Sequence, residues 1–348
     1  MILLSDISIL SAHDINVNLL HDFYKKIYLG HRKQKIWKWL NRSSFYDNKI
    51  PLVIIYKDHV IGHAGMIPFN VFLDGVQYTA SWFIDFALLP AFKKRGLGTI
   101  LVKKWMEFSD IFLAAPCNKQ SIRVFKKCGW EKSFDADIHH YYFKPFDHPK
   151  LSSSIPVFLR RILNKASCLF FQNIYNKYAL SIDRVHLDYV NRSSLDMLKT
   201  TLDTSSTDTI VPIRDKDYMS WRLLGSPDRN DYRVFSIEGI EEVKAVIKIC
   251  KKYYPYSIDL LWISNLSKLS IVRDLVATIG IWSMKMGYSY IRYHAFGRKL
   301  SDYLKETLKP ISNRSVFAFY AKDIELFNKL KISKWHWELI DSDFERFF

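Results

Sequence analysis

The sequence has few cysteines and no long apolar run, and each absence excludes a class of protein. Its 348 residues include four cysteines, and no two of them form a Cys-x-x-Cys pair. A disulfide framework and a cysteine zinc site are therefore not expected, whereas a reducing cytoplasm suits the chain. No stretch approaches the roughly 18 consecutive apolar residues of a membrane-spanning helix, so none is expected.

The N-terminal segment also lacks the features of a secretory signal. MILLSDISIL has no basic residues ahead of its apolar run, and Asp6 interrupts that run. Apolar residues make up 49% of the chain and aromatic residues 16%, which predicts a globular protein with extensive cores. The length suffices for two domains of ordinary size.

The charge is strongly unbalanced toward basic residues. Lys and Arg total 51 against 35 Asp and Glu, a formal net charge of +16. Such an excess favours a polyanionic partner, which includes nucleic acid, a lipid surface and a phosphorylated ligand. The charge alone does not choose among them.

Two stretches of the chain share one order of elements. KIWKWLN precedes the strand-like PLVIIY, a turn at Asp58-His59 and the apolar VIGHAGMI. DYMSWRL likewise precedes YRVFSI, a turn at Glu238-Gly239 and VKAVIKI. Trp39 lies 14 residues before Val53 and Trp221 lies 13 before Val234. We interpret this parallel as an internal duplication, although many α/β sequences look alike at this resolution.

The parallel continues to the end of each half. Helical runs are expected at residues 99–108 and 267–286, and basic helices at 119–127 and 298–309, each followed by closing strands. These patterns divide the chain into a first domain at 1–147, a linker at 148–181 and a second domain at 182–348.

The linker contains a predicted amphipathic helix at residues 157–178. Its apolar stripe consists of Leu159, Ile162, Leu163, Ala166, Phe170 and Ile174. Arg160, Arg161, Lys165 and Lys177 lie off that stripe. An interdomain helix packed on both halves is the preferred interpretation, and a helix lying on an anionic membrane surface is the alternative.

A basic turn with two glycines is the strongest local signal. In LLPAFKKRGLGTILVKKW a strand ends near Pro90, and a helix begins beyond Gly96 and Gly98. Unpaired N–H groups at a helix N-terminus bind phosphates, and glycine lets the backbone approach them closely. A Rossmann fingerprint would need a third glycine, and a Walker loop would need Gly-Lys-Ser/Thr, so neither is present.

A second segment, AAPCNKQSIRVFKKCGWE, follows about twenty residues later and makes the signal specific. Together the two segments resemble the GCN5-related N-acetyltransferase (GNAT) superfamily. Its Q/R-x-x-G-x-G/A loop corresponds to residues 93–98, with Lys93 in the leading position. The later motif is matched by Asn118, Ser121, Val124, Phe125, Lys127, Gly129 and Trp130.

The resemblance implies an α/β (α+β) fold of two tandem GNAT-like domains, each a mixed twisted sheet flanked by helices. The second half lacks the glycine pair and the basic cluster, so it is expected to be a degenerate copy that buttresses the first and walls the acceptor pocket. Aromatic residues that could line this pocket, although packing is the more ordinary role for each, are Tyr253, Tyr254, Tyr256 and Trp262.

The resemblance also implies a co-substrate, acetyl-CoA or another acyl-CoA, and no metal. Phe86, Ala87 and Leu88 would offer backbone groups to the pantetheine arm and to the thioester carbonyl, and Asn118 would bond the pantetheine. The remaining residues implied at the cofactor are Lys93, Lys94, Arg95, Gly96, Leu97, Gly98, Thr99 and Phe125.

The general acid of the family, often a tyrosine, is replaced here by Phe125. Another donor such as Ser121 or Cys117, a thiolate that leaves through water, or a loss of catalysis would each account for this. Asp85 is the first candidate for general base and His63 the second.

Two further candidates for the general base lie elsewhere in the chain. His139 and His140 lie in a late strand, expected on the substrate side. One tandem subgroup uses its C-terminal carboxylate, and this chain ends at Phe348.

The function expected is transfer of an acetyl group from acetyl-CoA to a primary amine. An amino sugar of bacterial surface-polysaccharide biosynthesis, nucleotide-linked or free, is the preferred acceptor. The alternatives are a peptidoglycan-bridge aminoacyltransferase of the FemABX type that uses aminoacyl-tRNA, and a non-catalytic module that binds coenzyme A or sugars. Nucleic acid is otherwise not an expected partner. The location expected is the cytoplasm, and the alternative interpretation of residues 157–178 would add a peripheral membrane contact. The oligomeric state stays open.

Overall fold

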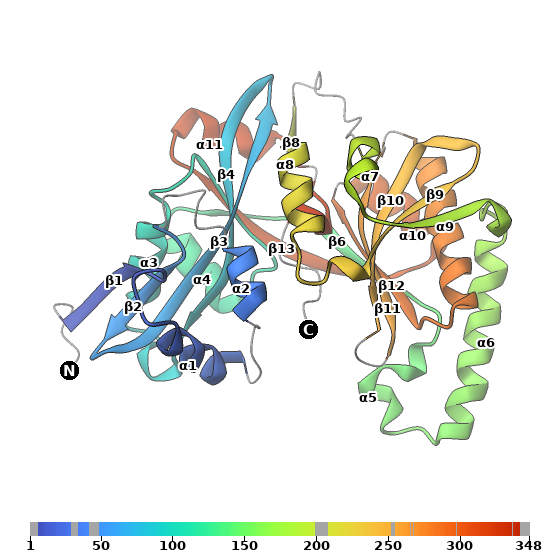
Figure 1. Ribbon diagram of the computed structural model, residues 1–348, viewed down its shortest axis with the longest axis horizontal. Coiled ribbons are helices and arrows are strands. Elements are labelled where there is room, and N and C mark those ends of the chain that lie inside the picture. The colour runs from blue at the N-terminus through green and yellow to red at the C-terminus, as the bar shows by residue number, and fades with distance from the viewer. Residues whose placement is uncertain are drawn as a thin grey trace.

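The computed structural model describes residues 6–28, 34–41, 49–198, 208–251, 255–264, 266, 268–296, 298–335 and 337–341. They form a twisted sheet that runs through the whole molecule, with helices on both faces (Figure 1). No helix in this part of the chain is long and apolar enough to cross a membrane.

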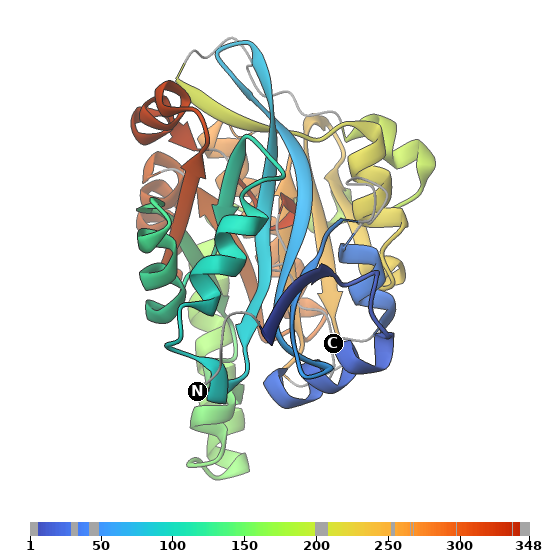
Figure 2. The same cartoon turned by 90° about the vertical axis from the view of Figure 1, so that its left-hand side faces the viewer.

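The first half contributes strands on one side of the sheet and helices on both of its faces. Its strands are β1 (Ile7–Ser11), β2 (Leu52–Tyr56), β3 (His59–Leu73), β4 (Val76–Leu88), β5 (Ile111–Ala114) and β6 (Glu131–Tyr142). Its helices are α1 (Val17–Tyr28), α2 (Gln34–Leu40), α3 (Leu97–Trp105) and α4 (Lys119–Lys127). Helices α3 and α4 cover one face, and α1 and α2 cover the other (Figure 2).

Two tight turns explain how the first strands pair. Lys57 and Asp58 both adopt positive φ between β2 and β3, and Asp74 and Gly75 do so between β3 and β4. Consecutive left-handed residues give the turn whose twist matches an antiparallel hairpin. The first turn therefore lies one residue before the Asp58-His59 position expected from sequence.

The second half follows an order of strands and helices similar to that of the first half, with additional elements. Its strands are β7 (Val185–Tyr189), β8 (Thr209–Ile213), β9 (Tyr232–Ile237), β10 (Ile240–Cys250), β11 (Ser257–Ile263), β12 (Tyr290–Phe296), β13 (Ile311–Ala321) and β14 (Lys334–Trp335). Its helices are α7 (Arg192–Met197), α8 (Lys216–Met219), α9 (Leu269–Lys285), α10 (Arg298–Leu308) and α11 (Ile324–Ile332). Between the halves lie α5 (Pro149–Ser152) and α6 (Val157–Tyr175).

The closing strands of the two halves are exchanged. The sheet order is β1-β2-β3-β4-β5-β13-β6-β12-β11-β10-β9-β7. Thus β13, from the second half, pairs antiparallel with β5, while β6, from the first half, pairs antiparallel with β12. Each half of the sheet thus continues into a strand that comes from the other half of the chain. The division at 147 and 182 stays a prediction, and strand pairing crosses it.

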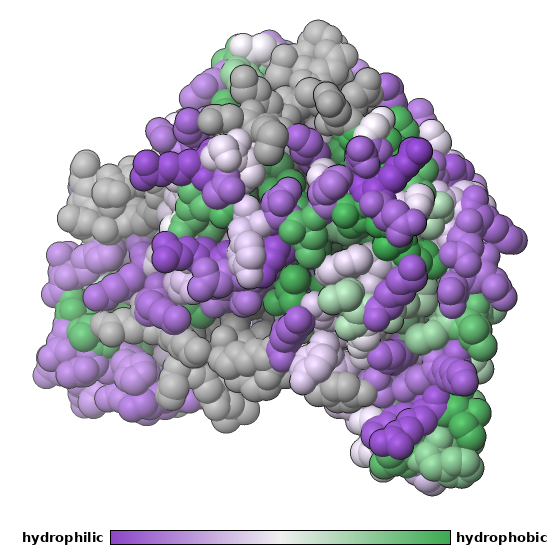
Figure 3. Space-filling view, turned by 45° about the vertical axis from the view of Figure 1, so that its right-hand side comes forward, coloured by the Kyte–Doolittle hydropathy of each residue, from purple (hydrophilic) through white to green (hydrophobic). Residues whose placement is uncertain are grey.

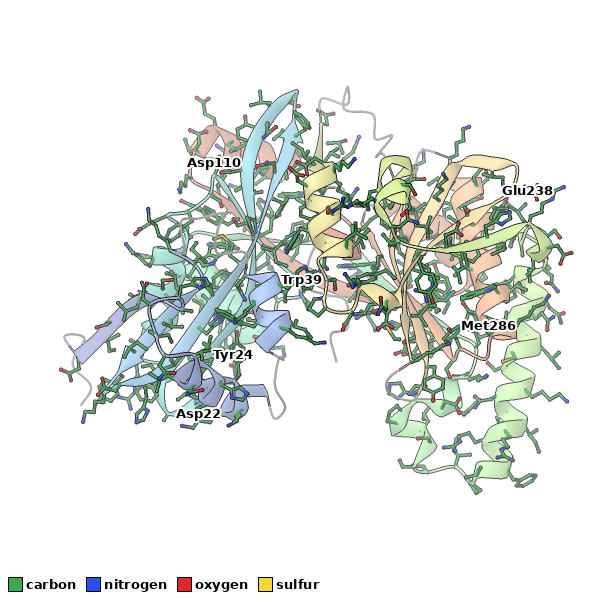
Figure 4. The ribbon with its side chains drawn as sticks, viewed as in Figure 1. Asp22, Tyr24, Trp39, Asp110, Glu238 and Met286 are labelled. Atoms are coloured by element: carbon green, nitrogen blue, oxygen red, sulfur yellow. The ribbon has the colours of Figure 1, made fainter. Side chains whose placement is uncertain are left out.

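The two tryptophans of the repeated pattern meet where the halves join. Trp39 Nε1 donates to the carbonyl of Trp221, and Trp221 Nε1 donates to the carbonyl of Trp39, both at 2.9 Å. Their rings lie 5.5 Å apart, and Figure 4 shows Trp39 between the halves. This reciprocal contact has the symmetry that a duplication predicts.

Helix α6 packs on the second half and on residues at the end of β6. Its inward side chains, Cys168, Phe171, Ile174 and Tyr175, join the core of the second half. Near its start, Asn164 Nδ2 donates to Asp147 at 2.8 Å. On the side of the first half, Cys168 Sγ donates to the carbonyl of Phe143 at 3.3 Å, and the Tyr175 ring lies 5.9 Å from the Phe143 ring. Helix α6 therefore contacts residues of both halves, as its preferred interpretation predicted.

Two buried histidines in the second half's part of the sheet predict a loss of stability in acid. Burial lowers the pKa of His139 to about 4, and burial beside Arg292 lowers the pKa of His294 to about 3. Their stabilisation is present above the unfolded pKa of about 6.5 and is lost as pH falls toward the folded values. Urea titrations should therefore show a smaller free energy of unfolding at pH 4.5 than at pH 7.

A neutral replacement of His139 should weaken this pH dependence. His139 Nδ1 lies 2.6 Å from Ser312 Oγ and Nε2 lies 3.2 Å from Ser301 Oγ, contacts that an asparagine amide can partly replace. His139→Asn should flatten the acid limb, while His59→Asn on the surface should leave it unchanged. An acid limb in His139→Asn as steep as in the wild type would contradict this explanation.

Candidate functional site

Strands β4 and β5 part in the middle of the first half. Their parallel pairing covers only Ala80–Trp82 against Ile111–Leu113. Beyond Trp82, β4 continues to Leu88 with β3 as its only strand partner in the pairing of the described residues, while β5 ends at Ala114. The edge of β4 from Phe83 to Leu88 therefore faces a gap between two strands.

A bulge at Asp85 directs backbone amides into this gap. The register of β3 against β4 shifts between His63 and Gly65, and Asp85 adopts a φ of +50°. After the bulge, Leu89 N donates to the carbonyl of Ile61 on β3 at 2.9 Å. Because amide direction alternates along a strand, the N–H groups of Phe86 and Leu88 face the opposite edge.

His63 holds the bulge from the other face of the sheet. Its Nδ1 lies 3.0 Å from the carbonyl oxygen of Asp85, and its Nε2 lies 3.4 Å from Trp37 Nε1 and 3.1 Å from Tyr24 Oη. Trp37 can only donate, so Nε2 is the acceptor and Nδ1–H donates to Asp85. The ring is fully buried, and Figure 4 shows Tyr24 on α1. This geometry makes His63 a support for the strand, and we do not retain it as a base.

The glycine turn begins α3 against the parted strand. Gly96 is the N-cap with a φ of +80° and provides no side-chain cap for the N–H groups of Leu97 and Gly98. The N–H of Thr99 donates to the carbonyl of Gly96 at 3.0 Å. A Cβ on Gly98 would lie 3.2 Å from Phe86 Cζ. Gly98 therefore lets the helix approach β4 more closely than a larger residue could.

A second helix N-terminus opens on the same side. Asn118 caps α4, with Oδ1 accepting from the amides of Gln120 and Ser121 at 2.9 Å each. Ser121 Oγ donates to the carbonyl of Asn118 at 3.0 Å. Two positive helix ends thus converge near the gap, an arrangement that favours anions.

These elements enclose a groove of about 490 Å³, referred to below as the β4–α3–α4 groove. Within the described part of the chain its lining includes basic residues and no acidic one. The lining residues are Lys26, Ile27, Phe86, Ala87, Leu88, Pro90, Lys93, Lys94, Gly96, Leu97, Gly98, Thr99, Asn118, Gln120, Ser121, Arg123, Val124 and Lys127.

Most residues expected at the cofactor come together here. Among those expected, Arg95 and Phe125 do not line the groove, and Asp85 lies immediately before the lining residue Phe86. Phe125 is buried and stacks on Trp130, with ring centroids 4.6 Å apart, so its side chain belongs to the core. Sequence reasoning missed Lys26 and Ile27 because α1 carries no motif that relates it to the glycine turn.

Two side chains were considered as proton donors in place of a tyrosine. The Cys117 thiol donates to the carbonyl of Ala114 at 3.1 Å, and burial raises its pKa to about 12. Cys117 does not line the groove, whereas Ser121 does. Ser121 is therefore the better placed of the two.

The corresponding gap in the second half is filled by protein. Strand β11 pairs with β12 only as far as Leu260, and the amide of Ile263 then donates to Glu338 Oε1 at 2.9 Å. Burial raises the pKa of Glu338 to about 8. The segment around Glu338 thus occupies the place that corresponds to the gap beside β4. The second half also lacks the glycine loop.

Other residues considered from sequence lie away from the groove. Trp262 is fully buried in the core shared by the two halves, so it does not line a pocket. His139 lies beneath α10, which corrects its expected place on the substrate side. Tyr253, Tyr254 and the chain end at 342–348 fall outside the described residues. The described residues contain no group of three or more His, Cys, Asp or Glu that could hold a metal.

Comparisons with known proteins agree with this geometry. Residues 16–130 match the model of the acetyltransferase (GNAT) family. A search of curated protein sequences gives no match. Solved structures resemble more than nine-tenths of the chain, which includes parts of both halves.

A GCN5-related N-acetyltransferase from Kribbella flavida superposes with a TM-score of 0.59 at 10% identity, covering 91% of this chain and 71% of that one. Saccharomyces cerevisiae N-myristoyltransferase with bound myristoyl-CoA gives 0.60 at 10% identity, covering 92% and 79%. A probable N-acyltransferase from Enterococcus faecalis gives 0.56 at 12%, covering 92% and 73%. The predicted α/β fold, a mixed and twisted sheet flanked by helices, is confirmed, and residues 16–130 match the acetyltransferase (GNAT) family.

Proposed function

We propose that this chain is an N-acyltransferase that binds acyl-CoA in the β4–α3–α4 groove and transfers the acyl group to a primary amine. The observation that carries the proposal is the coincidence of a parted strand pair with two helix N-termini in one basic groove. The coenzyme supplies an activated thioester. Acetyl-CoA is the first donor to test, and the solved myristoyl-CoA complex of a similar fold keeps longer chains under consideration.

The residues of the groove suit the parts of this co-substrate. The uncapped N-terminus of α3 and the side chains of Lys93 and Lys94 would hold the diphosphate. The gap beside β4 has the hydrogen-bonding edge that an extended pantetheine needs, and the N–H of Phe86 or Leu88 would stabilise the oxyanion that forms at the thioester carbon. Asn118 would reach the same arm from α4 through its side-chain Nδ2.

Asp85 and Ser121 are the proposed proton carriers. A carboxylate beside the bulge can take a proton from the acceptor's ammonium group, directly or through water, and so release the neutral amine that attacks the thioester carbon. Ser121 lies in the groove as a hydroxyl donor for the leaving thiolate, in the absence of a tyrosine at 125. The acceptor proposed first is an amino sugar, which rests on the sequence resemblance.

The two alternatives are less well supported. A basic glycine groove is not needed by an enzyme that uses aminoacyl-tRNA, and the glycine turn here opens into the groove. The non-catalytic alternative rests on Phe125 alone. A cytoplasmic location remains part of the proposal.

Asp85→Asn should lower kcat about 100-fold in a thiol-release assay with acetyl-CoA and a panel of amino sugars, polyamines and peptides, within the usual range for acid–base catalysis. The KM for acyl-CoA should change little, because Asp85 does not line the groove. Asp58→Asn is the matched control, since Asp58 also has positive φ and is exposed.

The assay distinguishes a wrong assignment of the general base from a failure of the proposed function. Full turnover by Asp85→Asn would assign the base to another group. If wild-type protein released no thiol with any acyl-CoA and any acceptor, the proposed function would fail.

A further inference from the structure

Helix α6 exposes a large part of its apolar surface. Exposed fractions are 71% for Phe158, 59% for Phe170, 54% for Leu169 and 52% for Ile162. Monomeric proteins seldom leave several large apolar side chains exposed side by side without a partner.

These side chains share one face of the helix. Phe158, Ile162 and Leu169 follow each other at intervals of four and seven residues, which places them in one row along a helix. Leu159 and Phe170 form a neighbouring row. The opposite face carries Asn164, Cys168, Phe171 and Tyr175, which pack inward, so the apolar rows point away from the protein.

The charge around this face has one sign. No Asp or Glu occurs between Asp147 and Asp183, although the chain contains 35 acidic residues. Arg161 and Lys165 are exposed on α6, next to the row that contains Phe158. The face therefore presents apolar side chains bordered by cations.

The shape of the molecule makes this face accessible. Helix α5 and the first turns of α6 extend beyond the sheet (Figure 1), and in the space-filling view they form a protruding corner where apolar and strongly hydrophilic surface adjoin (Figure 3). Leu151 on α5 and Val157 at the start of α6 add exposed fractions of 44% and 54% there.

We propose that α5 and α6 dock the protein on an anionic lipid surface, with the apolar rows of α6 entering the interface and Arg161 and Lys165 contacting headgroups. This is the physics of an interfacial amphipathic helix. A second copy of the chain fits less well, because the same cations would face each other. A polynucleotide would leave Phe158, Ile162 and Leu169 exposed to water. The inference is independent of the acyl-transfer proposal.

Sedimentation of the full chain with vesicles tests this proposal. We expect binding to vesicles of phosphatidylcholine with 20% phosphatidylglycerol, about tenfold weaker binding to pure phosphatidylcholine, and a large loss in 0.5 M NaCl because salt screens the cationic contribution. Phe158→Ser with Ile162→Ser should weaken binding at least tenfold, on the order expected from losing two buried apolar side chains.

A matched control uses two apolar residues that are equally exposed elsewhere. Ile324 and Ile332 are 66% and 84% exposed on α11, so Ile324→Ser with Ile332→Ser should bind vesicles like the wild type. Equal vesicle binding by the Phe158/Ile162 variant would overturn the proposal. The proposal would also be overturned if the wild type eluted as a dimer in gel filtration and the variant eluted as a monomer. Retention of the wild type on heparin without vesicle binding would overturn it as well. Thermal melting of each variant checks that it is folded.

Discussion

Gly98→Val should weaken acyl-CoA binding about 100-fold, equivalent to about 2.8 kcal/mol. A Cβ at this position would already lie 3.2 Å from Phe86 Cζ and 3.5 Å from Leu88 Cδ1. The two further methyl groups of valine would enter the groove or push α3 away from β4, and either change moves the N–H groups proposed to hold the diphosphate. Calorimetric titration of the folded variant with acetyl-CoA measures the loss.

Gly96→Ala is the local control for this experiment. A Cβ on Gly96 would meet no atom within 4 Å, so alanine there adds no bulk to the groove. Its φ of +80° adds about 1 kcal/mol of backbone strain, which should lower stability more than affinity. If Gly98→Val bound acyl-CoA as tightly as Gly96→Ala, the β4–α3–α4 groove would not be the coenzyme site.

Asp341→Ala should destabilise the folded chain by about 3–5 kcal/mol, because it leaves a buried guanidinium without its main partner. Arg214 donates to Asp341 Oδ1 from Nε at 2.8 Å and to Oδ2 from Nη2 at 2.6 Å, and both side chains are buried. Asp341 Oδ2 also accepts from the amide of Glu338 at 2.8 Å. Urea unfolding at pH 7 measures the difference.

Two further variants separate the ion pair from simple loss of packing. Arg214→Met with Asp341→Leu removes both charges, and should recover most of the stability lost by Asp341→Ala. Glu107→Ala breaks the exposed pair with Lys104, and should change stability by less than about 1 kcal/mol. A loss in Asp341→Ala as small as that in Glu107→Ala would show that Arg214 reaches water when its partner is absent.

Local sequence signals located much of the lining of the β4–α3–α4 groove. Gly96 is the left-handed N-cap of α3, and Asn118 is the N-cap of α4. Caps of this kind depend on residues that are near in sequence, so a sequence pattern can predict them. Lys26 joins the same groove from α1 through tertiary packing alone, so no local pattern could have placed it there.

The role of His63 could not be read from sequence for a related reason. A strand histidine is equally compatible with a base and with a buried support. The choice depends on Trp37 and Tyr24, which reach it from two helices. The filling of the second gap by Glu338 was likewise hidden, since 75 residues separate it from Ile263.

The repeated element order was visible in the sequence, but the exchange of closing strands was not. Turns and hydrophobic periodicity specify that β6 and β13 are strands, and they carry no information about which of two similar edges each strand joins. In the structure β13 joins β5 and β6 joins β12, and each of these pairings brings together strands from different halves of the chain.

The position of β13 in the sheet determines when the sheet can close during synthesis at the ribosome. Translation proceeds from the N-terminus, so β5 emerges some two hundred residues before its antiparallel neighbour at Ile311–Ala321. Strand β5 therefore cannot form this pairing until residues 311–321 have left the exit tunnel. A nascent chain stalled before residue 311 would hold the glycine turn and both helix ends, yet its sheet could not close as it does in the finished protein.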